Sequence, residues 1–292
     1  MHDPPRYFMT IAALAITTCT SEPASQDEEE LPTADEAFDS FMHTAGRIPD
    51  GRLVVDGDIL VDDEAEARAY FETQLDYTGV ELEHDDEFRL SVQTIDGIDQ
   101  FWSFPNRMLL TYCVDTTSFG TNAHALVVAL ERAAQSWSNV VGVRFQRVDA
   151  TPCDDTTNVT FNVAQLTMDY NALAFFPGDA RSDRELFVGP SAFTTNAGGR
   201  DLEGILRHEL GHILGFRHEH IWIDCVGFDE DPDQGDGENA RQLTPYDADS
   251  VMHYPQCGSS PQNGYRQSVH DYRGAASLYG LSPALHASTR VF

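Results

Sequence analysis

The chain has 292 residues, of which 48 are acidic and 18 basic, and its formal net charge at pH 7 is −30. Such a surface repels nucleic acid and anionic membranes, which excludes both as expected partners. The length suffices to bury a large core, with room for one main domain and an appendage.

The first residues have the pattern of an export signal. Arg6 precedes a short apolar run that ends near Thr17 and is followed by Cys19. The run is too short to span a bilayer, and no later segment is apolar over a sufficient length. We expect residues 1–19 to be a signal peptide and the protein to be secreted or held at the cell surface. Because Ile16 to Cys19 vaguely resembles a bacterial lipoprotein signal, two interpretations remain: simple cleavage, or a lipid anchor on Cys19.

Acidic residues dominate the next segment. Residues 20–100 contain 24 acidic and four basic residues. Their first part, 21–39, is rich in Glu, Asp, Pro and Ser, which is typical of a disordered tether. Leu53–Leu60 predicts a short strand broken by a glycine turn, and Asp63–Leu75 has the apolar spacing of a helix. We interpret residues 20–100 as an acidic tether followed by a propeptide.

From Phe101 the expected order is strand, helix, strand, strand, edge strand, strand, helix. Alternation predicts strands at Met108–Val114, Val143–Val148 and Asn158–Val163. Ala123–Val140 has apolar residues at helical spacing. Its side chains expected to face the core are Leu126, Leu130, Ala133 and Trp137. The pattern predicts an α+β fold.

Two further elements in this order bear on function. Leu173–Phe176 is expected to be an exposed edge strand, whose unpaired backbone groups could bind an extended peptide by strand addition. The last helix in the order begins after Asp201, which is a plausible N-cap. Strand addition is a natural way to hold a scissile bond.

The sequence HELGHILGFRH, which begins at His208, carries a metal-site pattern. His208 and His212 are four residues apart on one helix face, so both imidazoles can reach one zinc ion. Glu209 can act as general base on a water at the metal without binding the metal itself. Gly215 can take a left-handed conformation that ends the helix. His218 would then return as the third ligand and leave a fourth position open, as in catalytic zinc sites.

A second motif, Ser-Val-Met-His-Tyr from Ser250, follows about 30 residues later. Together the two motifs resemble the metzincin metallopeptidases, and the zinc site is most similar to the astacin branch. The resemblance implies that Met252 forms an apolar floor under the zinc ligands and that Tyr254 is a switchable fifth ligand that moves onto the oxyanion. It also implies that Glu219 is a buried anchor, in astacins often for the mature amino terminus. Taken singly, the three have ordinary alternatives: a core methionine, a turn aromatic and a surface charge.

Other segments resemble the matrixin branch. Ala172–Gly178 is similar to its edge-strand segment and Asp271–Gly280 to its last helix. The resemblance covers roughly residues 101–281. It implies a metzincin-like catalytic domain at residues 101–292, with a mixed twisted sheet, an active-site helix and a smaller irregular C-terminal subdomain. The implied activity is that of a zinc endopeptidase that acts on protein or peptide substrates with one catalytic zinc ion.

The segment before this domain contains a candidate latency switch. Val-Asp-Gly-Asp, which ends at Asp58, resembles the Phe-x-Gly-Asp motif of astacin propeptides, with Val55 in place of Phe. In those propeptides the final aspartate binds the catalytic zinc and displaces water. The alternative is a Gly-Asp turn between two short strands. No cysteine lies between Cys19 and Cys113, which excludes a cysteine switch of the matrixin kind.

Once Cys19 is assigned to the leader, four cysteines remain, and they allow three pairings. We expect Cys113 to pair with Cys153 and Cys225 to pair with Cys257, one bridge on each flank of the zinc helix. An oxidising, exported setting is consistent with such bridges.

Two acidic segments are candidates for calcium. Asp229–Glu238 is dense in carboxylates and glycine, which suits Ca²⁺, but it lacks the EF-hand spacing. A solvated loop is the alternative. Asp179–Asp183 is a second and weaker candidate.

Two other functions compete with an active endopeptidase: a zinc-binding module without activity, and a zinc hydrolase of a non-peptide bond. Glu209 argues against the first, because an idle general base has no structural reason to lie beside a ligand. His218 and the methionine turn argue against the second.

Overall fold

The computed structural model describes residues 38–39, 42–43, 45–55, 59–68, 90–168, 170–194, 200–222, 240–257 and 265–283. The chain divides into two units, Met1–Pro32 and Thr33–Phe292, and all the described residues belong to the second. Several predicted features lie outside them: the signal peptide with Cys19, nearly all of the acidic tether, Asp58, Cys225 and Asp229–Glu238. None of the helices in the described part has the length and apolar character that crossing a bilayer requires.

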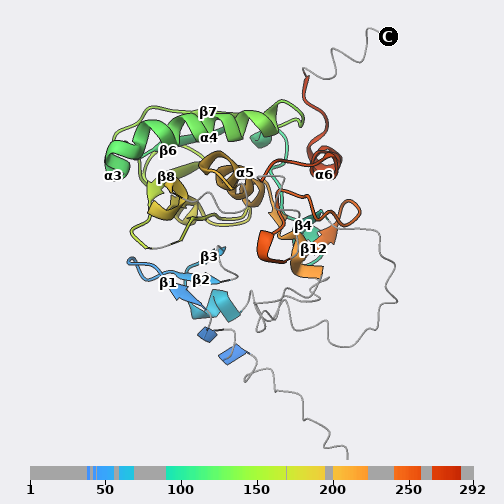
Figure 1. Cartoon of the computed structure of the whole chain (residues 1–292), viewed down its shortest axis with the longest axis horizontal. Helices are drawn as coiled ribbons and strands as arrows, with labels where there is room; N and C mark the ends of the chain where they lie inside the picture. The colour runs from blue at the N-terminus through green and yellow to red at the C-terminus, as the bar shows by residue number, and fades with distance from the viewer. Residues whose placement is uncertain are drawn as a thin grey trace, which may run out of the picture. The chain divides into compact units, whose positions relative to one another are not determined.

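A five-stranded sheet in the order β7-β6-β8-β10-β9 is central to the fold (Figure 1). Its strands are β6 (Leu110–Val114), β7 (Phe145–Arg147), β8 (Phe161–Gln165), β9 (Ala172–Leu173) and β10 (Glu185–Val188). Strands β7, β6, β8 and β10 pair in parallel with their neighbours in this order, whereas β9 is antiparallel to β10. The sheet is therefore mixed, as predicted.

The described helices are α3 (Thr116–Phe119), α4 (Ala123–Ser138), α5 (Leu202–Ile213) and α6 (Val269–Tyr279). Short 3-10 turns occur at Asn106–Met108, Gly120–Asn122, Arg181–Asp183, Pro190–Phe193, Glu219–Trp222 and Pro255–Cys257. From β6 to α5, the sequence of longer elements is the one predicted from Phe101. The α+β architecture is thus confirmed.

Alternate side chains of the central strands and the inner faces of α4 and α5 form the main core. Leu110, Tyr112 and Val114 of β6 belong to it, together with Phe161 and Val163 of β8. The four core residues predicted on α4 are fully buried: Leu126, Leu130, Ala133 and Trp137. The helical spacing of the sequence therefore identified the packed face correctly.

A second sheet joins the region before Phe101 to the domain. It contains β4 (Ser91–Ile95), β5 (Ile98–Asp99), β11 (Phe216–Arg217) and β12 (Ala240–Gln242), and β4 pairs antiparallel with each of the others. Leu90 lies in the main core. Residues before Phe101 thus pack against residues that follow it, and the domain boundary after Gln100 stays a prediction. Composition could not reveal this packing, because β11 and β12 follow β4 by more than a hundred residues.

A third, antiparallel sheet of β1 (Gly46–Arg47), β2 (Leu53–Val55) and β3 (Ile59–Val61) covers the edge of the central sheet. Ile59 forms a parallel bridge with Ala174. Side chains from this sheet pack in one cluster with Phe176 and in another with Leu173 and Phe187. Leu173–Phe176 is therefore buried, and the expectation of an exposed edge strand was wrong, because the chain's own N-terminal segment covers that edge.

Candidate metal centre

The helix that carries the first two histidines is α5. The Asp201 carboxylate accepts a hydrogen bond from the Gly204 amide at 2.7 Å and caps the helix, which confirms the predicted N-cap. Leu206, Leu210 and Ile213 bury the helix in the main core. These residues flank His208 and His212 along the helix, so their packing holds both histidines in place.

The three histidines converge on one point. The Nε2 atoms of His208, His212 and His218 are 3.2 Å apart in each of the three pairs, and all three residues are buried. Three nitrogens at about 2.0–2.1 Å from a tetrahedral zinc ion would be separated by about 3.3 Å. The donor set and its spacing therefore fit zinc.

Backbone carbonyls set the protonation of two of these rings. Nδ1 of His208 donates to the Val251 carbonyl at 2.7 Å, and Nδ1 of His212 donates to the Phe216 carbonyl at 2.8 Å. Because a carbonyl only accepts, each Nδ1 carries the proton, and the lone pair lies on Nε2. Such partners orient a ligand ring and keep its metal-binding nitrogen available.

Gly215 turns the chain between the second and third ligands. Its φ is +98°, and a Cβ at this position would lie 2.1 Å from the Gln100 carbonyl oxygen. Both the backbone conformation and the close approach require glycine. The chain then enters β11, which leads directly to His218.

The methionine turn lies beneath α5. Met252 is fully buried, and a Cβ added to Gly211 would lie 2.3 Å from its sulfur. The buried carboxylate of Asp271 holds the turn by accepting hydrogen bonds from the Ser250 hydroxyl at 2.6 Å and the Val251 amide at 2.8 Å. Burial raises the pKa of Asp271 to about 6, although these hydrogen bonds oppose the rise.

Sequence reasoning had not singled out Asp271. The pattern Ser268-x-x-Asp271 is a capping box at the start of α6, and the structure contains both of its hydrogen bonds. That signal predicts the helix start. It does not indicate that the same carboxylate reaches the methionine turn.

Glu219 is fully buried next to the third ligand. Its amide donates to the Met252 carbonyl at 2.9 Å, and its Oε1 accepts from the Asp247 amide at 2.8 Å. In this structure the carboxylate thus ties the third ligand to the segment that leads into the methionine turn.

Aromatic rings surround the histidines. The Tyr254 ring lies 4.3 Å from the His218 ring and 4.6 Å from the His220 ring, measured between centroids. Tyr265 stacks on His208 at 5.1 Å, and Phe176 meets His212 edge-on at 5.6 Å. These contacts exclude solvent from the ligand rings.

Sequence reasoning had not singled out Tyr265, Phe176 or His220 for the site. Nothing in the local sequence of Tyr265 or Phe176 marks them, because both reach the site through the tertiary fold. His220 follows His218 by two residues. The structure does bring together Glu209, Met252, Tyr254 and Glu219 with the three histidines. Glu209 follows the first ligand on α5 and is only 3% exposed.

The predicted bridge between Cys113 and Cys153 is present. Cys257 is also disulfide-bonded. Its pairing with Cys225, which lies outside the described residues, stays a prediction.

The weaker calcium candidate, Asp179–Asp183, does not form a ligand cluster. In the part of the chain that the structure describes, the histidine triad is the only group of three or more convergent metal-binding side chains. Asp179 instead accepts a hydrogen bond from the Phe176 amide at 2.8 Å. Burial raises its pKa to about 7. The carboxylate therefore stabilises the turn that follows the edge strand.

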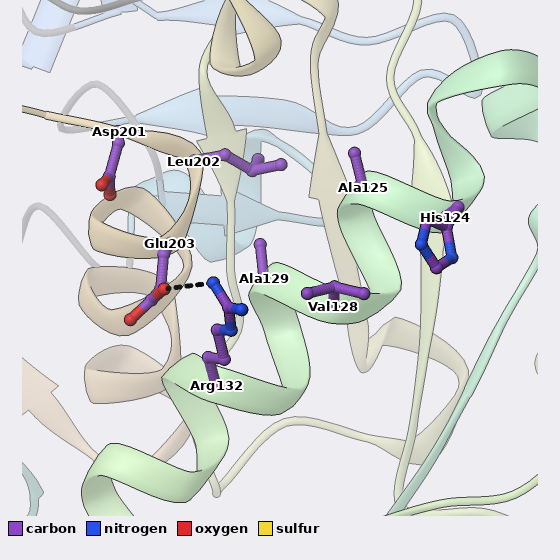
Figure 2. Close-up of a pocket in the computed structure, with 8 residues that line it drawn as sticks. All are labelled: His124, Ala125, Val128, Ala129, Arg132, Asp201, Leu202 and Glu203. Atoms are coloured by element: carbon purple, nitrogen blue, oxygen red, sulfur yellow. Dashed lines mark ion pairs between the residues drawn. The ribbon is translucent and has the colours of Figure 1, made fainter.

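A separate surface groove of about 330 Å³ lies between α4 and the start of α5 (Figure 2). It is lined by His124, Ala125, Val128, Ala129, Arg132, Asp201, Leu202 and Glu203. Arg132 points toward Glu203, and the ion pair between them spans 3.9 Å. The groove lacks the convergent ligands of the histidine site.

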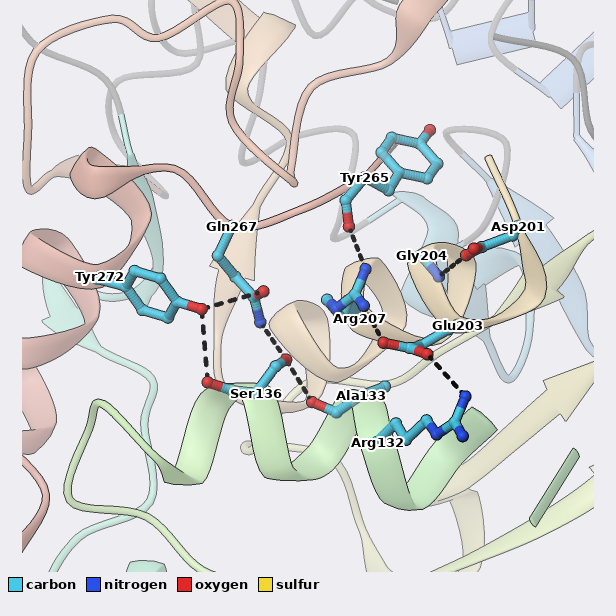
Figure 3. A network of polar contacts seen from close by, with 10 residues as sticks. All are labelled: Arg132, Ala133, Ser136, Asp201, Glu203, Gly204, Arg207, Tyr265, Gln267 and Tyr272. Atoms are coloured by element: carbon cyan, nitrogen blue, oxygen red, sulfur yellow. Dashed lines mark hydrogen bonds and ion pairs between the residues drawn. The ribbon is translucent and has the colours of Figure 1, made fainter. Parts of the chain in front are cut away.

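A polar network links α5 to its surroundings on this side of the fold (Figure 3). Arg207 forms an ion pair with Glu203 and donates to the Tyr265 carbonyl at 3.0 Å. Gln267 donates to the Ser136 hydroxyl on α4 at 2.7 Å. The network thereby positions the segment that places the Tyr265 ring on His208.

Comparisons with known proteins agree with this geometry. The matrixin family model matches residues 101–222. Macrophage metalloelastase of Rattus norvegicus is 23% identical over 281 residues, which is 92% of this chain and 54% of that protein. An astacin-like metalloendopeptidase of Gallus gallus is 38% identical over 77 residues, which is 23% of this chain and 19% of that protein. This chain thus spans about half the length of the first relative and about a fifth of the second.

Among solved structures, high choriolytic enzyme 1, a hatching enzyme zinc-protease from Oryzias latipes (medaka), matches with a TM-score of 0.42. Its sequence is 19% identical, and the match covers 61% of this chain and 94% of that one.

Proposed function

We propose that the chain is a metzincin metallopeptidase and acts as a zinc-dependent endopeptidase with Glu209 as its general base, which the similarity to the matrixin family model and to the metalloproteinase relatives supports. One observation carries the proposal: three buried Nε2 atoms lie 3.2 Å apart beside the carboxylate-bearing residue Glu209. His208, His212 and His218 would hold the ion. Bound zinc lowers the pKa of a water molecule toward about 7 and polarises the scissile carbonyl.

The chain's own residues supply the proton transfers. Glu209 accepts the proton that the attacking water loses and then donates it to the nitrogen of the leaving amine. The Tyr254 hydroxyl donates a hydrogen bond to the oxygen that becomes negative in the tetrahedral adduct. The buried rings around the ligands lower the local polarity, which strengthens both interactions.

The N-terminal segment is proposed to be a propeptide. Its support is the parallel bridge between Ile59 and Ala174, which lies on the strand that runs toward Phe176 and its contact with His212. A peptide that paired with this strand would pass the ligand rings, so the N-terminal segment and such a peptide compete for one place. Asp58 remains the proposed latency switch, by resemblance to astacin propeptides.

We further propose that the protein is exported, with residues 1–19 as its signal and Cys19 as the site of any lipid anchor. The disulfide between Cys113 and Cys153 supports this, because such bridges persist in oxidising compartments.

The test compares the mature wild-type protein with Glu209→Gln on a quenched peptide and on casein, with zinc content measured in both. A positioned general base contributes roughly 10²- to 10⁴-fold, so the variant should lose that factor in kcat and retain stoichiometric zinc. Glu131→Gln, on the exposed side of α4, is the matched control and should cut like the wild type.

Other outcomes separate the rival functions. If the wild type binds zinc and cuts no peptide after removal of the N-terminal segment, the protein is a binding module or acts on a non-peptide bond. Equal cutting by wild type and Glu209→Gln would exclude this residue as the base.

A further inference from the structure

The zinc helix ends in a buried position where its last carbonyls need partners. The amides of Leu214 and Gly215 satisfy the carbonyls of Leu210, Gly211 and His212. The carbonyls of Ile213, Leu214 and Gly215 come next, and all three residues are buried. The last carbonyls of a helix have no partner within the helix and must find donors elsewhere.

Three donors from distant segments satisfy these carbonyls. The Trp102 indole N–H donates to Ile213 at 2.7 Å, and the Tyr279 hydroxyl donates to Leu214 at 2.5 Å. The Gln93 amide in β4 donates to the Gly215 carbonyl at 2.8 Å.

The first two donors are themselves linked. The Trp102 amide donates to the Tyr279 hydroxyl at 3.2 Å, so this hydroxyl both accepts and donates. Both side chains are buried, with exposures of 6% and 1%. Burial also raises the pKa of Tyr279 above its ordinary value, which favours the protonated, donating hydroxyl.

The end of the zinc helix and its three donors lie between the first two histidines of the site and the third. His208 and His212 are fixed by α5, whereas His218 follows β11, which pairs with β4 through Phe216 and Val92. The turn at Gly215 is the only covalent link between the two parts. A Cβ on Gly215 would lie 2.1 Å from the Gln100 carbonyl oxygen, and the Gln100 amide donates to the Gln93 carbonyl of β4 at 2.7 Å.

We propose that Tyr279 and Trp102, together with the Gln93 amide, are positioning residues that fix the end of the zinc helix and thereby place His218 for metal binding. The inference rests on the proposed zinc site. It does not require that the bound metal cleaves peptides.

The experiment uses the full chain and the substitution Tyr279→Phe, which removes only the hydroxyl. Tyr272→Phe is the matched control: it lies on the same helix, is half-buried, and its hydroxyl contacts Gln267 and the Ser136 carbonyl instead. For each protein we would measure the zinc dissociation constant by chelator competition, the visible spectrum of the Co²⁺-substituted form and the Tm of the zinc-free form.

Loss of a hydrogen bond that orients metal ligands typically weakens metal affinity by about 10- to 100-fold. We expect Tyr279→Phe to raise the zinc dissociation constant by that factor and to alter the Co²⁺ spectrum. Tyr272→Phe should change neither. A Tyr279→Phe protein with a lower Tm but wild-type zinc affinity and Co²⁺ spectrum would refute the positioning role and leave a purely structural one.

Trp102→Phe serves as a second variant if Tyr279→Phe does not fold. It keeps an aromatic ring but removes the donor to the Ile213 carbonyl together with part of the buried indole ring, so it should weaken zinc binding in the same direction. An unchanged zinc affinity in a folded Trp102→Phe protein would equally overturn the proposal. Failure of the proposed function appears separately, as full zinc binding without peptide cleavage.

Discussion

Asp271 gives a prediction whose magnitude follows from the structure. Its Oδ2 accepts from the amides of Val251 and Ser268, and its Oδ1 accepts from the Ser250 hydroxyl. An asparagine can keep the two amide bonds with its oxygen and turn its NH₂ group toward the hydroxyl, which can accept. Asp271→Asn therefore removes the ionisation at little cost in packing.

The sign of the pH effect follows from the pKa. Burial raises the pKa of Asp271 from its ordinary value of 3.8 to about 6 in the folded protein. A raised pKa in the fold means that the carboxyl group contributes stability below about 3.8 and loses this contribution as the pH rises through about 6. The difference of about two units corresponds to about 3 kcal/mol in the free energy of unfolding. An asparagine at this position does not ionise, so its contribution to the free energy of unfolding does not change with pH.

The assay is urea unfolding of wild type and Asp271→Asn at several values from pH 4 to pH 7.5, both saturated with zinc. Protonation of the zinc ligands is common to both proteins and cancels in the difference. Relative to wild type, the variant should become more stable with rising pH, by up to about 3 kcal/mol over this range. A difference that stays constant with pH would refute the reasoning about Asp271.

Three further predictions concern the frame of the site. Gly215→Ala should weaken both folding and zinc binding, because φ is +98° and the new Cβ would approach the Gln100 carbonyl. Urea unfolding and chelator competition measure the two effects, and unchanged values in both would contradict the claim that this turn requires glycine. The double variant Cys113→Ala/Cys153→Ala opens a loop with a sequence separation of 40 and should lower the free energy of unfolding by about 4 kcal/mol; a loss below about 1 kcal/mol would show that the loop is constrained without the bridge. Chelation of zinc should lower the Tm, since zinc at about 1,000 times its dissociation constant adds about 4 kcal/mol; an unchanged Tm would mean that the folded chain does not bind the ion.

Local patterns predicted the parts of the fold that depend on neighbouring residues. The spacing in Ala123–Val140 predicted α4 nearly to its ends, because one continuous apolar stripe packs on the sheet. The convergence of His208, His212 and His218 could be predicted for the same reason, since two lie on one helix and the third follows its end. Asp201 as a cap also depends only on the next few residues.

The parts that failed depend on contacts between distant segments. β4 pairs with β11 and β12, so no local signal joins Leu90–Gln100 to the catalytic region. The edge strand was expected to be exposed because its own sequence cannot show that Ile59 lies against Ala174. The same holds for Asp271 under the methionine turn and for Tyr265 on the ring of the first ligand.

The dependence of the zinc helix on Tyr279 has a consequence for the newly made chain. His218, the last ligand, precedes Tyr279 by 61 residues (279 − 218). At roughly 5–20 residues per second, a ribosome needs about 3–12 s to add them. During that interval the nascent chain contains the three histidines and Glu209, yet the helix end still lacks its hydroxyl donor. A chain that stops short of α6 would therefore carry the complete zinc-binding motif without an assembled zinc site.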